Sequence, residues 1–212
     1  VMPDTYVTPS GDPAPFTVNP DGSQGPPVTA GMIRRRGEAM ILAVDAASSG
    51  DCFAIVAVTR HPKDRKRPAI RKYKLWSPAD FPDKRVHFEE PEAFIRQICK
   101  FYNVKQIAYD PYQLEDMMQR LNRERVAWCE EFLQGAPRLE SDRALFDAIM
   151  QGKLAHRENP ANPGALRQHI INSKAKLQKE EDSKLRILKK AADRKIDLTV
   201  CVSMVTVETM TT

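Results

Sequence analysis

Short apolar runs separated by turn residues mark the chain from residue 40 onward. The runs 40–45 and 52–58 have the length of buried strands, and the Ser-Ser-Gly-Asp segment between them is typical of a turn, so we expect a hairpin. A charged tip at 60–67 leads to a third run at 69–76. The pattern predicts three consecutive antiparallel strands.

Helical and strand patterns alternate after that point. Apolar residues recur at helical spacing over 92–102, and 106–110 is again a short apolar run. We expect further helices over 113–123 and 141–150, the second capped by the serine at its start, and a fifth strand over 125–129. This order predicts a mixed α/β fold in which helices cover both faces of a central sheet.

The last apolar segment, 196–207, fits two structures. Its β-branched valines alternate with other residues, which favours a strand. A helix that begins near Asp193 would instead place Asp193, Asp197 and Cys201 on one face. The periodicity does not decide between the two.

The first 37 residues differ in composition from the rest. Seven of the 16 prolines fall in the first 27 residues, among glycines, serines and aspartates. This composition opposes both helix and sheet. We therefore expect a Pro-rich extended arm or linker over 1–37 and a folded domain over 38–212.

Composition places the chain among ordinary globular proteins. The 212 residues are 42% hydrophobic and 29% charged, with a formal charge of +5. No window approaches the ~20 apolar residues that a membrane-spanning helix needs, so we expect no membrane segment. Four separated cysteines without a Cys-x-x-Cys pair predict reduced thiols of a cytosolic protein. The chain begins with Val and has no signal peptide, which indicates a fragment of a longer protein.

Two of the predicted strands end in a carboxylate. Asp45 closes the run 40–45, and Asp110 closes 106–110. If these strands are adjacent and parallel, both carboxylates lie at one edge of the sheet, where they repel each other unless a cation lies between them. Divalent cations prefer such oxygen ligands, and two of them about 4 Å apart can activate water against a phosphodiester. Asp197 is the candidate third carboxylate.

Five short motifs, in this order, resemble one protein family. They are Val44-Asp45-Ala46-Ala47, Ala108-Tyr109-Asp110, Gly152-Lys153-Leu154-Ala155-His156, Leu166-Arg167-Gln168-His169-Ile170 and Lys195-Ile196-Asp197-Leu198-Thr199-Val200. Together they look like the C-terminal nuclease domain of the large terminase subunit of tailed bacteriophages, over roughly residues 38–210.

The resemblance implies an RNase H-like α/β fold, with a central mixed β-sheet flanked by helices and the third acidic residue on the last helix. It implies an endodeoxyribonuclease that cuts concatemeric viral DNA during packaging, with a two-metal site for Mg²⁺ or Mn²⁺ and little sequence specificity. Asp45, Asp110 and Asp197 match the acidic triad of the family. Asp51 matches an additional acidic position, as a secondary ligand, and Asp193 is an alternative third ligand.

The same resemblance implies the partners and the location. The partners are double-stranded DNA and, in the full-length protein, the packaging ATPase domain, the portal and the small terminase subunit. The location is the cytoplasm of the infected bacterial host, at the procapsid portal. The chain has no G-x-x-x-x-G-K-[ST] phosphate loop, so we expect the nuclease portion alone, without ATP hydrolysis.

Basic residues gather in two stretches. Residues 60–74 have eight basic residues against one acidic, and residues 167–195 have ten against four, so the remainder carries a charge of −8. Basic stretches that flank an acidic centre suit an anionic substrate. The histidines lack zinc-site spacing, and we expect core or surface positions for them. The predicted DNA contacts are Arg65, Lys66, Arg67, Arg71, Lys72, Lys189 and Lys190.

Two other functions remain open from the sequence. A non-catalytic DNA-binding or motor-docking module could share the fold, although the complete triad argues against it. Another RNase H-like nuclease, such as a junction resolvase or a transposase core, would also use clustered carboxylates. Divalent-ion binding tests the first alternative, and cleavage of branched against linear duplex tests the second.

Overall fold

The computed structural model describes residues 37–48, 50–156, 159, 162–177 and 184–211, together with four short strands between residues 6 and 27. The main sheet consists of β5 (Met40–Asp45), β6 (Phe53–His61), β7 (Asp64–Trp76), β8 (Val104–Tyr109), β9 (Cys129–Glu131) and β10 (Ala155–His156). The helices are η1 (Pro78–Asp80), α2 (Glu89–Phe101), α3 (Glu115–Arg123), α4 (Ala136–Met150), α5 (Ala165–Ile171) and α6 (Asp197–Thr211). A separate hairpin is formed by β11 (Ser173–Leu177) and β12 (Leu185–Lys189).

The sheet has six strands in the order β10-β7-β6-β5-β8-β9. β5, β6 and β7 pair antiparallel, as the sequence predicts, whereas β8 pairs parallel with β5 and β9 parallel with β8. Tight turns suffice for the antiparallel strands, while the parallel ones need longer connections, which α2 and α3 provide. The predicted mixed α/β class is confirmed.

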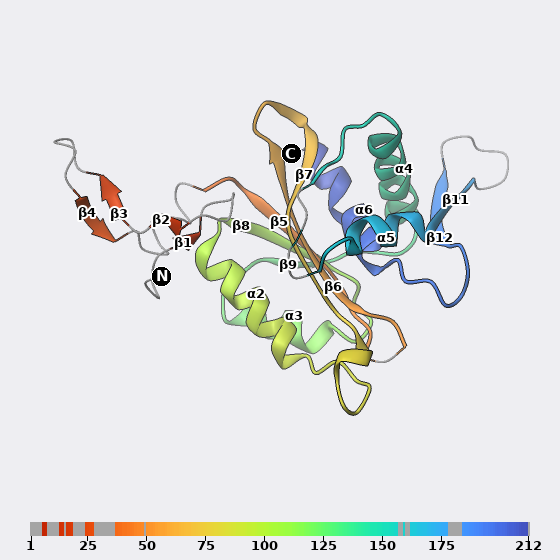
Figure 1. Ribbon diagram of the computed structural model, residues 1–212, viewed down its shortest axis with the longest axis horizontal. Coiled ribbons are helices and arrows are strands. Elements are labelled where there is room, and N and C mark those ends of the chain that lie inside the picture. Colours follow the sequence, from red (N-terminus) through yellow and green to blue (C-terminus); the bar gives the residue numbers. More distant parts are fainter. Residues whose placement is uncertain are drawn as a thin grey trace.

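Helices cover both faces of this sheet, α2 and α3 on one and α4, α5 and α6 on the other (Figure 1). Alternate residues of β5 serve the two layers: Leu42 belongs to the core beneath α2 and α3, and Ala43 to the core beneath α6. Because β5 is buried from both sides, its residues form a continuous apolar run rather than an alternating one.

α6 is a helix, although its valines favour a strand. Apolar residues on most sides of α6 are buried, among them Leu198, Val202 and Met204, since the helix lies between the sheet and α4. Burial on this scale overrides the small β preference of valine. Of the two alternatives, the helix is present, but it begins at Asp197 rather than near Asp193, which lies in an exposed turn.

Two other predicted boundaries need correction. α4 starts at Ala136, five residues before Ser141, because Pro137 suits a first helical turn. Ser141 is therefore not a cap, and its hydroxyl donates instead to the Ser203 carbonyl of α6. The strand expected over 125–129 is β9, which begins at Cys129.

The N-terminal segment contains regular structure that its composition does not predict. β1 (Tyr6–Val7) pairs with β2 (Pro13–Ala14), and β3 (Phe16–Val18) pairs with β4 (Gln24–Pro27). Two-stranded ribbons tolerate proline because each strand has a free edge. Apart from Gly37, the rest of the predicted arm over 1–37 lies outside the described residues, and the boundary at 37/38 stays a prediction.

All four cysteines are buried and free of disulfides. Within the part of the chain that the structure describes, none of the helices combines the length and apolar character that a bilayer crossing requires.

Candidate functional site

Two carboxylates meet at one edge of the main sheet. Asp45 is the last residue of β5, and Asp110 follows the end of β8 directly. The two strands are parallel neighbours with Val44 opposite Tyr109, and the Asp110 N–H donates to the Val44 carbonyl at 3.3 Å. The adjacency on which the sequence argument depends is therefore present.

Asp197 completes an acidic group with these two. It is the first residue of α6, where the helix dipole favours an anion, and α6 packs across β5 and β6. Asp197 is only 5% exposed. Its Oδ2 is buried and has no hydrogen-bond partner among the described residues. A buried carboxylate oxygen without a donor is costly unless something else satisfies it.

The pKa values show that the three acids interact. The pKa of Asp45 is raised to about 7, first by burial and then by the negative charges of Asp197 and Asp110, with Arg138 opposing the shift. Burial also raises the pKa of Asp197, to about 6, against the lowering effect of its backbone hydrogen bond. Such a group stabilises a positive charge placed among it.

His169 on α5 adjoins Asp197. Its Nδ1 accepts the Leu198 N–H at 3.1 Å and lies 3.9 Å from Asp197 Oδ2. Burial lowers the pKa of His169 to about 4, with a further lowering by Lys195. The ring is therefore neutral near pH 7. We expect core or surface positions for the histidines, and His169 lies in the core. The sequence does not indicate that it lies beside a carboxylate.

Asp51 is held by two lysines. Lys189 Nζ donates to both Asp51 oxygens at 2.7 Å, and Lys195 Nζ donates to Oδ1 at 2.9 Å. Burial raises the pKa of Asp51, but the hydrogen bonds and charges of these lysines more than offset it, so the pKa lies below its usual value. Lys195 also donates to the Gly50 carbonyl, which ties the β5–β6 turn to the segment before α6.

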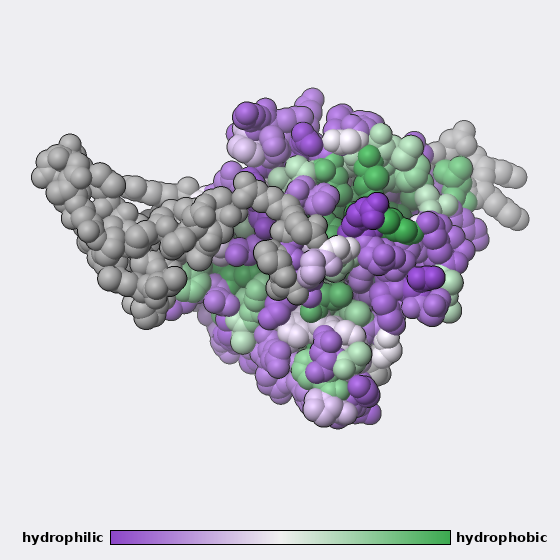
Figure 2. Space-filling view, viewed as in Figure 1, coloured by the Kyte–Doolittle hydropathy of each residue, from purple (hydrophilic) through white to green (hydrophobic). Residues whose placement is uncertain are grey.

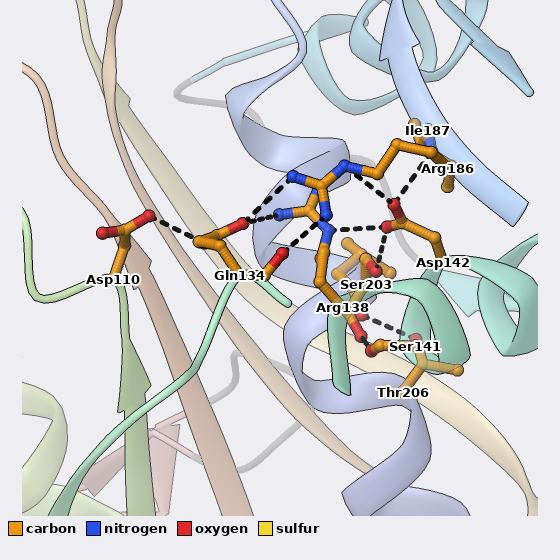
Figure 3. Close-up of polar contacts among 10 residues, drawn as sticks. Asp110, Gln134, Arg138, Ser141, Asp142, Arg186, Ile187, Ser203 and Thr206 are labelled. Atoms are coloured by element: carbon orange, nitrogen blue, oxygen red, sulfur yellow. Dashed lines mark hydrogen bonds and ion pairs between the residues drawn. The ribbon is translucent and has the colours of Figure 1, made fainter. Parts of the chain in front are cut away.

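Asp110 is held from two sides, and Figure 3 shows its contact with Gln134. Its Oδ1 accepts the Tyr112 N–H at 2.9 Å, and its Oδ2 accepts from Gln134 Nε2 at 2.7 Å. Gln134 lies in the turn between β9 and α4. Its Oε1 accepts from Arg138 Nη1 at 3.1 Å and from Arg186 Nη2 at 3.4 Å. Gln134 thus connects Asp110 to two arginines.

The Arg138 side chain rests on a buried carboxylate. Asp142, one helical turn later on α4, accepts from Arg138 Nε at 2.7 Å, from the Ser203 hydroxyl at 2.6 Å and from the Ile187 N–H at 2.8 Å. Neither Arg138 nor Asp142 exposes more than 3% of its side chain. One sign of this network is present in the sequence, the four-residue spacing of Arg138 and Asp142. The same spacing is common in ion pairs on exposed helix surfaces, so it does not predict a buried network.

The carboxylates fit a divalent cation. Among the described residues, no group of three or more His, Cys, Asp or Glu side chains already has the spacing of a metal site. Asp45, Asp110 and Asp197 nevertheless supply the oxygen donors that hard cations prefer. The unsatisfied Oδ2 of Asp197 and the raised pKa values of Asp45 and Asp197 are both features that a bound cation would relieve.

The first basic stretch lies away from these carboxylates. Asp45 pairs with Ala54 at one end of β6, whereas Arg65 and Lys66 follow the turn at the other end, roughly 20 Å distant at ~3.3 Å per residue. This β6–β7 tip is hydrophilic, at the top of the view in Figure 2. The two basic stretches therefore do not both lie next to the acidic group: the first begins at the far end of β6, and Lys189 of the second bonds to Asp51 near the acidic end.

The other predicted DNA contacts from this stretch have partners within the chain. Arg67 Nε donates to the Lys153 carbonyl at 3.0 Å, and Arg71 pairs with Glu38 at 2.8 Å. The Lys72 ammonium lies 5.2 Å from the centre of the Tyr102 ring. Lys189, in the second stretch, pairs with Asp51, and Lys190 follows it at the end of β12.

Fold and site together define a class of protein, the RNase H-like domains, with acidic residues on two adjacent strand ends and on the last helix. Residues 82–212 match the family described as terminase large subunit, endonuclease domain. The match covers more than half of the chain, and the chain belongs to this family. In a comparison with curated proteins, nothing matches.

Solved structures share the fold at low identity. The large terminase of bacteriophage HK97 is 15% identical with a TM-score of 0.64, over 80% of this chain and 39% of that one. The human cytomegalovirus terminase nuclease domain, in a structure soaked with Mn and with an inhibitor bound, is 12% identical with a TM-score of 0.51, over 81% of this chain and 82% of that one. The chain thus spans about two fifths of the HK97 protein.

Proposed function

We propose that this chain is a metal-dependent endodeoxyribonuclease that hydrolyses phosphodiester bonds of concatemeric viral DNA during genome packaging, with little sequence specificity. The observation that carries the proposal is the meeting of Asp45, Asp110 and Asp197 at one sheet edge, with one buried Asp197 oxygen unsatisfied. Membership of the terminase endonuclease family supports it.

In this proposal the three carboxylates hold two divalent cations, Mg²⁺ or Mn²⁺. When bound, the cations lower the pKa of a water nucleophile and stabilise the charge on the leaving oxygen. Asp45 contributes negative charge from a half-buried position at the end of β5, and Asp197 from a buried one at the start of α6. Asp110 is oriented by the Tyr112 N–H and by Gln134. Asp51 and Asp193 remain candidates for a secondary and an alternative ligand.

The basic side chains hold the DNA backbone in this proposal. Lys189 and Lys190 are those at the acidic end of the sheet, since Lys189 bonds to Asp51 in the turn that follows β5. Arg65 and Lys66 extend the contact to the far end of β6 and β7. Phosphate contacts carry no base information, which accords with weak specificity.

The proposed setting is a larger packaging machine. Residues 1–37 would form the arm that leads from the packaging ATPase domain, and 38–212 the nuclease domain. The portal and the small terminase subunit would be the other partners, at the procapsid portal in the infected bacterial cell. The HK97 large terminase, more than twice as long as its matched part, supports such a division.

Cleavage of supercoiled plasmid tests the proposal. The whole chain should convert it to open-circular and linear forms with Mn²⁺ or Mg²⁺, and EDTA should abolish the reaction. Asp45→Asn should lower the cleavage rate at least ~100-fold, because it removes the negative charge of a proposed metal ligand. Asp83→Asn, which changes a surface aspartate paired with His87, is the matched control and should cleave normally. Undiminished cutting by Asp45→Asn would exclude the assigned site.

A further inference from the structure

Gln134 lies between Asp110, a proposed metal ligand, and the side chains of two arginines. On one side its Nε2 donates to Asp110 Oδ2 at 2.7 Å. On the other its Oε1 accepts from Arg138 and Arg186 at 3.1 and 3.4 Å. No other described side chain bonds to Asp110 in this structure.

The two arginines dictate which end of the Gln134 amide faces Asp110. A guanidinium can only donate, so it requires an acceptor, and the amide oxygen is the only acceptor that the Gln134 side chain has. The NH₂ group must then point the other way, toward an acceptor, and Asp110 Oδ2 is that acceptor at 2.7 Å. The orientation of the Gln134 amide follows from this chemistry.

The arginines themselves are fixed. Arg138 is buried on Asp142, which also accepts from the Ser203 hydroxyl and the Ile187 N–H. Arg186 Nη1 also donates to the Gln134 main-chain carbonyl at 3.1 Å, so Gln134 is held by its backbone as well as its side chain. This chain of bonds links α6, α4 and β12 to the end of β8 (Figure 3). Gln134 is therefore a rigid donor.

We propose that Gln134 is a positioning residue for Asp110, which sets the carboxylate in the orientation that binds the divalent cation. The inference rests on the proposed function. Each carboxylate oxygen can accept about two bonds, so Oδ1 and Oδ2 keep capacity for a cation after they accept from Tyr112 and Gln134. Asp110 follows a strand end and is only half-buried, so packing alone does not fix its rotamer.

The test is Mn²⁺ binding by isothermal titration calorimetry on the whole chain. Gln134→Met keeps the length of the side chain but removes both polar ends, and it should weaken Mn²⁺ binding by about 10-fold, as loss of a bond to a ligand typically does. Gln119→Met is the matched control, because Gln119 also donates to a carboxylate, Glu115, but on α3 at the other face of the sheet. It should bind Mn²⁺ like the unsubstituted chain.

A further readout separates positioning from a general effect on the fold. Gln134→Met should cleave plasmid nearly normally at saturating Mn²⁺ and lose activity only at low Mn²⁺, whereas a distorted fold would lose activity at both. In an Asp110→Ala background, Gln134→Met should cause no additional loss of Mn²⁺ affinity, because the residue through which it acts is gone. Gln134→Ala should behave like Gln134→Met, with thermal midpoints recorded for each variant.

The outcomes distinguish this inference from the proposed function. If the unsubstituted chain binds no Mn²⁺, both are overturned. If it binds Mn²⁺ and Asp45→Asn abolishes the binding, the proposed site stands. Equal Mn²⁺ affinity of Gln134→Met and Gln119→Met would then overturn the positioning role alone, as would a full additional loss in the Asp110→Ala background.

Discussion

The carboxylate of Asp197 and the imidazole of His169 face each other across the start of α6, with 3.9 Å between Asp197 Oδ2 and His169 Nδ1. No hydrogen bond joins them, since Nδ1 already accepts the Leu198 N–H at 3.1 Å. His169 therefore supplies the helix with an acceptor for one of its free N–H groups and leaves the Asp197 oxygen unsatisfied. The helix start is stabilised without neutralising the acid beside it.

This arrangement predicts a pH dependence of stability. The pKa of His169 falls from 6.5 to about 4 in the folded chain, so the unfolded chain binds the proton more readily. His169 then contributes stability that is present above pH 6.5 and is lost as the pH falls toward 4, on the order of 2 kcal/mol. His169→Gln keeps an acceptor but cannot titrate. Urea unfolding at pH 7 and pH 4.5 should show that the original chain loses stability relative to this variant.

The contrary result for His169 would be a constant difference between the two proteins across that range. The comparison with His169→Gln is needed because Asp45 and Asp197, with raised pKa values, change the stability of both proteins in the opposite direction. Their contribution cancels in the difference.

Removal of one acidic charge should stabilise the metal-free chain. The pKa of Asp45 is 3.8 when unfolded and about 7 when folded, so the folded chain holds the proton more tightly. The stability is complete below pH 3.8 and is lost as the pH rises through 7. At pH 8 and in EDTA, Asp45→Asn should therefore raise the free energy of unfolding by on the order of 1–2 kcal/mol.

Addition of Mn²⁺ should reverse that order. The cation binds the folded original chain and stabilises it by mass action, while Asp45→Asn gains little. Thermal midpoints with EDTA and with millimolar Mn²⁺ measure both effects, and Asp83→Asn should follow the original chain in both. A variant that is less stable than the original chain in EDTA would contradict the electrostatic account of Asp45.

β5 is predictable because a strand that is buried on both faces has a continuous apolar run, and β8 because its buried end, 107–109, is apolar. In both cases a carboxylate directly follows the apolar residues and stands out. α6 is not predictable in this way, since β-branched residues favour a strand locally and only its burial between the sheet and α4 makes it a helix. The local sequence pattern therefore predicts an element only when its residues favour the same structure, helix or strand, that the element adopts in the fold.

The surroundings of the carboxylates are harder to predict than the carboxylates. Gln134 meets Asp110 across 24 positions, and Lys189 meets Asp51 across 138. Nothing in a single sequence marks such pairs. The two lysines near Asp51 are predictable as basic residues, but their pairing with an acid is visible only once β12 is placed against the β5–β6 turn.

Asp51 gives a further prediction. Since both of its oxygens accept from lysines, Asp51→Asn should loosen the β5–β6 turn and lower stability by at most about 1 kcal/mol. Its effect on Mn²⁺ affinity should be much smaller than that of Asp45→Asn. Calorimetric titration of the two variants makes the comparison, with Lys189→Gln as a control that breaks the same pair from the other side. An equal loss of affinity would show that Asp51 is a ligand.

The distant basic tip should affect DNA binding but not the chemical step. Arg65 and Lys66 are exposed and lie roughly 20 Å from Asp45, so they can contact phosphates without contacting the reacting bond. The double substitution Arg65→Gln, Lys66→Gln should weaken duplex binding and reduce the slope of log affinity against log salt by about 2, one for each phosphate contact. The cleavage rate at saturating DNA should stay unchanged.

The control for the tip removes the same charge from another surface. Lys100 and Arg123 are exposed on α2 and α3, and Lys100→Gln with Arg123→Gln lowers the net charge equally. If the tip contacts DNA, only the tip variant should change the slope of log affinity against log salt. The slope depends on the number of phosphates that the protein neutralises, whereas long-range attraction depends on the total charge, which both variants lower equally. Equal behaviour of the two double variants would remove Arg65 and Lys66 from the DNA-binding surface and leave Lys189 and Lys190, at the acidic end, to hold the strand.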